Sequence, residues 1–96
     1  MGGWVYILAS KRNGTLYAGV TANLPARMMQ HRAGKGSSFA AKYGAARLVH
    51  AEHFERIDDA VAREKAIKKW RREWKLRLIE HGNPDWNDLF EHILGA

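Results

Sequence analysis

The chain contains no cysteine, which excludes a disulfide framework and a zinc site with thiolate ligands. No apolar run approaches the roughly 20 residues that a membrane-spanning helix needs. The N-terminal segment has no basic leader followed by a long apolar core, so we expect no signal peptide. With 96 residues there is little room for a second core. We therefore expect a cytoplasmic protein without a membrane partner, folded as a single domain over residues 1–96.

Acidic residues are also scarce, because 16 lysines and arginines stand against 10 aspartates and glutamates. The formal net charge is +6, and the pI near 10.0 indicates a polyanionic partner. Seven of the thirteen residues from 65 to 77 are basic: Lys65, Lys68, Lys69, Arg71, Arg72, Lys75 and Arg77. The alternative to a nucleic-acid interface is an ordinary solvated helix face.

Two strand-like apolar runs, one with Tyr6 and one with Tyr17, flank a loop that contains Asn13-Gly14. This dipeptide is the strongest short-range signal for a two-residue hairpin turn. Such a turn pairs Tyr6 with Thr21 and directs both tyrosines to the same face of the sheet. Two phenols side by side on a small basic protein indicate a functional site.

The rest of the chain predicts one more strand and three helices. A helix starts near Asn23, which can act as its cap, and stops near Gly34. A loop with a short turn at residues 39–42 leads to a strand over residues 47–54. One long helix then runs from Asp58 to a point before His81, and a short helix covers residues 86–94. This order, β-β-α-β-α-α, predicts an α+β fold with a small three-stranded antiparallel sheet flanked by helices.

Glu64 is anomalous because it lies within the apolar arc of the long helix. A carboxylate there needs a salt-bridge partner, a route to solvent, or a hard cation such as magnesium or manganese. Trp70 and Trp74 belong to the same apolar stripe, so we expect them in the core rather than stacked on nucleic-acid bases.

Arg27 and His31 are one helical turn apart and share a face of the first helix. An arginine beside a site can clamp a phosphate, and a histidine can shuttle protons or accept a hydrogen bond from a phenol. An ordinary surface pair is the alternative. Phe39, Lys42 and Tyr43 lie in the loop beside the expected site, where they either contact a nucleic-acid backbone or cover the sheet edge.

Together these residues resemble the GIY-YIG nuclease superfamily, and within it the branch of small, single-domain, excinuclease-like proteins. Tyr6 stands in the first motif, and Tyr17 and Gly19 stand in the second. The resemblance continues through residues 19–31, 62–70 and 83–86, so it covers essentially the whole chain. The chain departs from the pattern at three positions: Trp4 replaces a glycine, Ala18 an isoleucine, and Val20 a lysine of some repair nucleases.

The resemblance implies an endonuclease that hydrolyses DNA phosphodiester bonds with one Mg²⁺ or Mn²⁺ ion. Cleavage would be directed by DNA structure or be weakly sequence-selective, with a role in DNA repair or recombination. The implied site residues are Glu64 as metal ligand, Tyr6 or Tyr17 as general base, Arg27 on the phosphate, His31 beside them, and Asn83 or Asn87 as the catalytic asparagine. The sequence does not decide between the two tyrosines or the two asparagines.

The implied nucleic-acid-binding residues are Lys42, Lys65, Lys68, Lys69, Arg71, Arg72 and Lys75. The sequence does not separate DNA from RNA as the substrate, and a protein partner that delivers the substrate stays an alternative. A noncatalytic nucleic-acid-binding module is the main competing hypothesis. A protein whose basic face binds an acidic partner is a third.

Overall fold

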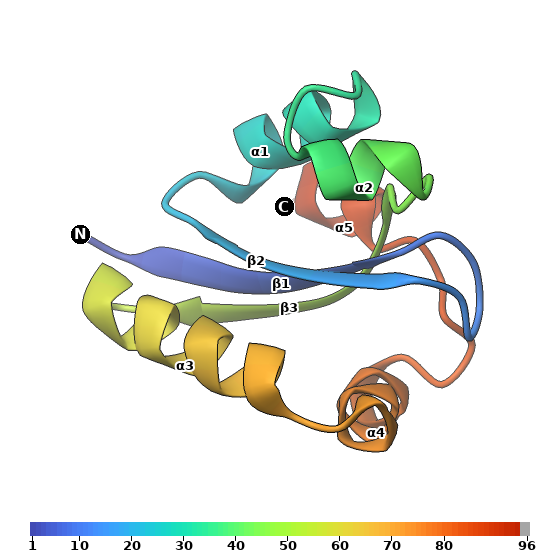
Figure 1. Cartoon of the computed structure of the whole chain (residues 1–96). Coiled ribbons are helices and arrows are strands. Elements are labelled where there is room, and N and C mark those ends of the chain that lie inside the picture. Colours follow the sequence, from blue (N-terminus) through green and yellow to red (C-terminus); the bar gives the residue numbers. More distant parts are fainter. Residues whose placement is uncertain (95–96) are drawn as a thin grey trace.

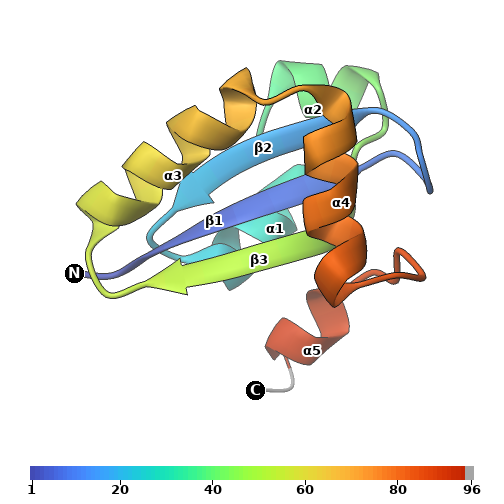
Figure 2. The ribbon, with the colours of Figure 1, turned by 90° about the horizontal axis from the view of Figure 1, so that it is seen from below.

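A three-stranded antiparallel sheet with the order β2-β1-β3 lies at the centre of the computed structural model, which describes residues 1–94 (Figure 1). The strands are β1 (Gly3–Ala9), β2 (Leu16–Thr21) and β3 (Arg47–Phe54). One face of the sheet is covered by α3 (Ile57–Lys69) and α4 (Arg72–Gly82), and the other by α1 (Leu24–Arg32), α2 (Ser38–Lys42) and α5 (Phe90–Leu94) (Figure 2). The predicted α+β class and antiparallel sheet are confirmed.

Alternating residues of β1 divide the core into two clusters. Val5, Ile7 and Ala9 pack with residues of α3 and α4, whereas Tyr6 and Leu8 pack with residues of α1, α2 and α5. All five side chains are buried because β1 is the central strand and both of its faces are covered. The tyrosine side of the sheet is therefore the side of α1.

The predicted hairpin register is wrong by two residues. Tyr6 lies opposite Gly19 rather than Thr21, and Tyr17 lies opposite Leu8. The loop is longer than the two-residue turn, because Ser10 donates its backbone N–H to Thr15 and Gly14 donates to Lys11. A shift of two residues preserves the side-chain face, so Tyr6 and Tyr17 still point to the same side.

The prediction of one long helix from Asp58 to a point before His81 is also wrong. The structure has two helices there, α3 and α4. Trp70 and Arg71 adopt extended backbone conformations, with ψ values of 151° and 150°. A continuous helix of that length would extend about 36 Å, beyond the longest dimension of the fold, 32 Å. The break lets α4 cross the end of the sheet and contact β3 (Figure 2).

The last helix, α5, begins at Phe90 instead of the predicted Trp86. Trp86 is fully buried in the core with a positive φ of 56°, and its indole N–H donates to Glu80 at 2.9 Å. The short turn expected at residues 39–42 is the helix α2. The strand at residues 47–54 and the helix capped by Asn23 are confirmed.

Within residues 1–94, no helix is both long enough and apolar enough to cross a membrane. The cytoplasmic location and the extent of the single domain are not tested by the structure and stay predictions.

Candidate active site

Tyr6 lies in the middle of the central strand, and its ring crosses over Gly19 of the neighbouring strand. A Cβ atom at Gly19 would lie 2.4 Å from both the Cζ and the hydroxyl oxygen of Tyr6, closer than real contacts allow. The glycine therefore makes room for the phenol. This contact gives a physical reason for a tyrosine in one strand and a glycine opposite it in the next.

The hydroxyl of Tyr6 lies 2.9 Å from Nε2 of His31, and both side chains are buried. Asn23 caps α1 by accepting a hydrogen bond from the backbone N–H of Ala26, and the burial of Met28 fixes which face of the helix meets the sheet. Burial, and then the nearby Arg27 cation, lower the pKa of His31 below its ordinary 6.5. The imidazole is therefore neutral at pH 7.

Arg27 joins this pair from the same face of α1. Its Nε donates to the Tyr6 hydroxyl at 3.4 Å, and Nη1 donates to Gln30 at 3.0 Å. The hydrogen bond to Tyr6 and the proximity of Tyr17 raise the pKa of Arg27, so the guanidinium stays charged. A hollow of about 330 Å³ opens beside Arg27 and is lined by Val20, Thr21, Asn23, Ala26, Arg27 and Gln30.

Tyr17 is the more exposed of the two tyrosines. Its ring centroid lies 6.4 Å from that of Tyr6, and it meets His31 edge-on at 5.5 Å. On the other side Tyr17 stacks on Phe39 of α2 at 6.3 Å. Phe39 in turn contacts Tyr43, whose ring lies 5.5 Å from Nζ of Lys42. The expected proximity of this segment to the site is confirmed.

Glu64 lies on the inner face of α3 and is only 8% exposed. It forms an ion pair of 2.8 Å with Lys68, one turn along the helix. Burial is the main reason why the pKa of Tyr6 is raised above that of a free phenol. The hydrogen bond and charge of Arg27 oppose this increase, and the charges of Tyr17 and, last, Glu64 add to it.

The fit of these residues to a divalent cation depends on that one carboxylate. Within residues 1–94 no cluster of three or more His, Cys, Asp or Glu side chains could hold a metal. Magnesium nevertheless often uses one or two protein carboxylates and takes its other ligands from water and substrate phosphate. Glu64 supplies one buried carboxylate, which is the protein ligand that a site of that kind requires.

Asn83 forms its side-chain hydrogen bonds outside the tyrosine cluster. Its side-chain N–H groups donate to the carbonyls of Val49 at 3.1 Å and Asn87 at 2.8 Å, and its side-chain oxygen accepts from the backbone of Asn87. Asn83 is buried, whereas Asn87 is exposed. The Asn83 amide therefore fixes the turn after α4 against β3.

The basic residues are divided between two places. Lys42 is on α2 beside the tyrosines, and the others lie along α3, the break and α4. Arg72 donates to the carbonyls of Asn13 and Gly14 at 2.7 and 2.6 Å, so it holds the hairpin loop. The residues that are exposed are Lys42, Lys65, Lys68, Lys69, Arg71 and Arg72, and Lys75 is half-buried.

Sequence reasoning missed Gly36, which shapes the histidine pocket. A Cβ atom at Gly36 would lie 2.5 Å from Nδ1 of His31, and this nitrogen has no hydrogen-bond partner among the described residues. Gln30 was also missed as the partner of Arg27. The only sequence signals were the short Gly/Ser-rich stretch after α1 and the spacing of three between Arg27 and Gln30.

Residues 2–77 match the GIY-YIG catalytic domain. The chain belongs to the GIY-YIG family. It is 40% identical over 77 residues to a UPF0213 protein of Staphylococcus haemolyticus, which covers 80% of this chain and 93% of the relative. A UPF0213 protein of Clostridium perfringens is 42% identical over 76 residues, which are 79% of this chain and 81% of the relative.

A solved structure has the same fold. The solution NMR structure of a UPF0213 protein from Bacillus halodurans matches with a TM-score of 0.58 and 28% identity, covering 92% of this chain and 93% of that one. GIY-YIG domains are nuclease domains that generally use a divalent metal, and their substrate is nucleic acid. The resemblance inferred from the motifs is confirmed, and a nuclease is the general class of activity that it implies.

Proposed function

We propose that this GIY-YIG protein is a metal-dependent endonuclease that hydrolyses DNA phosphodiester bonds at the Tyr6–Tyr17 face. The observation that supports this most is the convergence of two phenols, one guanidinium and one imidazole from three elements, with a buried carboxylate near by. A protein that only binds DNA has no need of a carboxylate that can hold a metal ion.

Tyr17 is our candidate for the general base. Tyr6 is fully buried and its hydroxyl already contacts His31 and Arg27, whereas Tyr17 is partly exposed. As a phenolate, Tyr17 would accept a proton from the water whose oxygen attacks phosphorus. As the bond from the water oxygen to phosphorus forms, the bond from phosphorus to the leaving oxygen breaks. Negative charge builds up on the phosphate and leaving oxygens in the transition state, where a cation stabilises it.

Arg27 would contact the phosphate directly. Its Nη2 forms none of the side-chain hydrogen bonds found within the described chain, and the guanidinium borders the hollow between α1 and β2. Because the pKa of Arg27 is raised, its charge is available at any working pH. Removing one such stabilising group from an active site typically lowers the rate about 10²–10³-fold.

Glu64 would hold the cation, after exchanging the ammonium group of Lys68 for it. The chemistry that Mg²⁺ or Mn²⁺ would supply there is Lewis-acid polarisation of the phosphate and stabilisation of the leaving oxygen. Tyr6 and His31 are positioning residues: they hold each other and orient Arg27 through its Nε. Asn83 has a structural role in this proposal.

The basic residues of α2, α3 and α4 would bind the DNA backbone without reading its sequence. We propose a substrate selected by its structure, or with weak sequence preference, in DNA repair or recombination. RNA as a substrate, and a protein partner that delivers the substrate, are further outcomes that a substrate panel would distinguish.

The decisive experiment measures nicking of supercoiled plasmid with Mg²⁺ or Mn²⁺ by the wild type and by Glu64→Gln. We expect cleavage that is lost with a chelator and falls at least 10²-fold in the variant. Glu55→Gln is the matched control. It removes the same charge as Glu64→Gln, but at an exposed position away from the cluster. Equal cleavage by wild type and Glu64→Gln would refute the proposal. A panel of nicked, flapped, branched and single-stranded DNA and RNA then identifies the substrate.

A further inference from the structure

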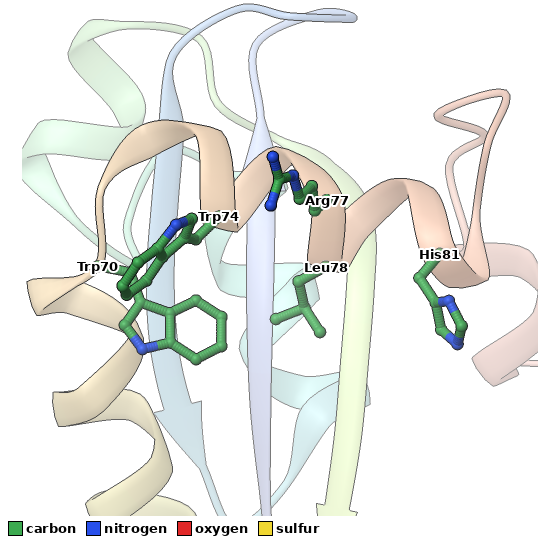
Figure 3. Close-up of a pocket in the computed structure, with 5 residues that line it drawn as sticks. All are labelled: Trp70, Trp74, Arg77, Leu78 and His81. Atoms are coloured by element: carbon green, nitrogen blue, oxygen red, sulfur yellow. The ribbon is translucent and has the colours of Figure 1, made fainter.

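A shallow, open groove of about 430 Å³ lies along α4, where this helix meets the end of α3 (Figure 3). Its lining residues are Trp70, Trp74, Arg77, Leu78 and His81. Trp70 and Leu78 pack against the cluster on the α3 and α4 side of the sheet. The groove therefore lies on the face opposite to Tyr6 and Tyr17.

Of the two tryptophans expected in the core, Trp70 packs against it, whereas the prediction is wrong for Trp74. Trp74 is 43% exposed, and Trp70 is partly buried. Their rings meet edge-on with centroids 6.2 Å apart, and Figure 3 shows the two indoles side by side at one end of the groove. Exposed tryptophan side chains are enriched at binding interfaces, because the ring offers a large apolar surface together with a polar N–H group.

Each indole is accompanied by a guanidinium group. Arg63 lies over Trp70 and Arg71 lies over Trp74, both with 5.0 Å from Cζ to the ring centroid. Arg63 is held by Glu52, to which its Nε donates at 3.0 Å and its Nη2 at 3.3 Å. This ion pair fixes Arg63 against Trp70, so that the position of the first indole is set before any ligand binds.

The residues around the groove add further positive charge. Arg77 lines it, and Arg71 lies over the ring of Trp74. Glu73 is the nearby acidic residue, and it pairs with Arg71 at 3.6 Å. Aromatic surfaces with cations beside them are the combination that binds single-stranded nucleic acid, since bases stack on the rings and phosphates meet the cations.

We propose that this Trp70–Trp74 groove binds a single-stranded segment of nucleic acid. A base would stack on the exposed ring of Trp74, and the adjoining phosphates would contact Arg71 and Arg77. The volume of the groove falls within the range of about 300–1,000 Å³ typical of small-ligand pockets. The inference rests on the proposed function in one respect, namely that the bound strand is a single-stranded part of the substrate next to the cleavage site. The binding itself can be tested without cleavage.

A second copy of the chain is a poorer occupant. In a two-fold contact each protomer presents the same surface to the other. Such a contact would bring Arg71 and Arg77 of both protomers together, and like charges oppose this. A polyanion with planar rings complements both the charge and the aromatic character of the groove.

The test is a fluorescence titration with a labelled 12-nucleotide oligothymidylate in the presence of EDTA, in the Glu64→Gln background. We expect Trp74→Ala to weaken single-strand binding about tenfold, and Arg77→Ala to weaken it with a smaller salt dependence. Binding to a 12-base-pair duplex should change less than twofold in Trp74→Ala. Arg56→Ala is the charge-matched control, because Arg56 is exposed at the opposite end of α3.

Unchanged oligothymidylate affinity in Trp74→Ala would overturn the inference, as would an equal loss for single strand and duplex. Sedimentation that shows a wild-type dimer and a Trp74→Ala monomer would assign the groove to a second copy instead. Single-strand binding that depends on Trp74 in a wild type that cleaves nothing would leave the inference intact and refute the proposed nuclease. The two proposals therefore fail separately.

Discussion

The imidazole of His31 and the phenol of Tyr6 form a buried, neutral hydrogen-bonded pair, with 2.9 Å between Nε2 and the hydroxyl oxygen. The pKa of His31 is lowered, and that of Tyr6 is raised, in both cases chiefly by burial. The pair is therefore suited to orient a neighbour, and the neighbour within reach is Arg27, whose Nε donates to the same hydroxyl.

The two tyrosines should respond differently to removal of the hydroxyl. Tyr17→Phe deletes the proposed base, so single-turnover cleavage should fall about 10²–10⁴-fold with little change in DNA affinity. Tyr6→Phe removes only the partner of Arg27 and His31, so the rate should fall less. Because Arg27 then loses its orientation, Arg27→Lys should add little further loss in Tyr6→Phe. Parallel losses of rate and affinity in Tyr17→Phe would contradict the assignment.

Protonation of His31 should destabilise the fold below about pH 6.5. A histidine of the unfolded chain titrates near pH 6.5, and in the folded state the pKa of His31 is lower. Between these values the unfolded chain binds more protons, so stability is complete above about pH 6.5 and decreases as the pH falls toward the folded value. We expect the urea midpoint to decrease from about pH 7.5 to about pH 5.5 in the wild type.

His31→Gln should be less sensitive over this range, whereas His92→Gln, which changes an exposed histidine, should behave as the wild type. Glu52 and Asp88 act at lower pH. Burial alone would raise the pKa values of both carboxyl groups. The hydrogen bonds from Arg63 to Glu52 and from Arg32 to Asp88 nevertheless lower these pKa values below the ordinary 4.5 and 3.8, respectively. An unchanged slope in His31→Gln would show that other groups cause the effect.

Gly19→Ala should disturb both stability and activity, because the new methyl group would overlap the Tyr6 ring. Overpacking of this kind typically costs about 1–3 kcal/mol of unfolding free energy. Gly82→Ala is the matched control: no atom lies within 4 Å of a Cβ there, so this change should be neutral or stabilise by up to about 1 kcal/mol. Urea denaturation measures both. Equal stability of the two variants would mean that Tyr6 can move away at no cost.

Lys68 should compete with a divalent cation for Glu64. Replacing it by methionine removes the 2.8 Å ion pair. Helix ion pairs of this kind contribute about 0.3–0.5 kcal/mol, so the affinity of the variant for Mn²⁺ should be at least about twofold higher. Titration followed by electron paramagnetic resonance of free Mn²⁺ measures this without cleavage. Lys69→Met is the control for the loss of charge. Equal tightening in both variants would exclude specific competition by Lys68.

Asn83→Ala should lower stability rather than the rate of folded enzyme. The change leaves the carbonyls of Val49 and Asn87 without their donor, at a cost of about 1–3 kcal/mol. We expect a lower urea midpoint and, at a temperature where the variant is folded, a rate within severalfold of wild type. A large loss of rate at unchanged stability would return Asn83 to the catalytic residues.

The hairpin shows which part of a site the sequence can predict. The Asn13-Gly14 pair predicts a two-residue turn, but the strands close at Ser10 and Thr15 around a longer loop. The facing of Tyr6 and Tyr17 is still correct, because side chains alternate with a period of two and the register error is also two. Face is therefore predictable from periodicity, whereas the contact of Tyr6 with Gly19 requires the actual register.

The helix break shows what sequence could not supply. No glycine or proline lies between Ile67 and Leu76, so local signals favour a continuous helix. The dimensions of the sheet, which depend on the whole chain, oppose it. Once the break is present, Trp74 leaves the apolar face of α3 and becomes exposed on α4. The misplacement of Trp74 thus follows directly from a tertiary constraint.

The two hydrogen bonds from Arg72 to the carbonyls of Asn13 and Gly14 couple the hairpin loop to the first turn of α4. Loops at the tips of hairpins usually tolerate inserted residues. Here an insertion between Asn13 and Gly14 would remove the acceptors that hold the basic helix at its N-terminal end. This tip is therefore a structural joint, and a tag or reporter placed there would release α4 as well as lengthen a loop.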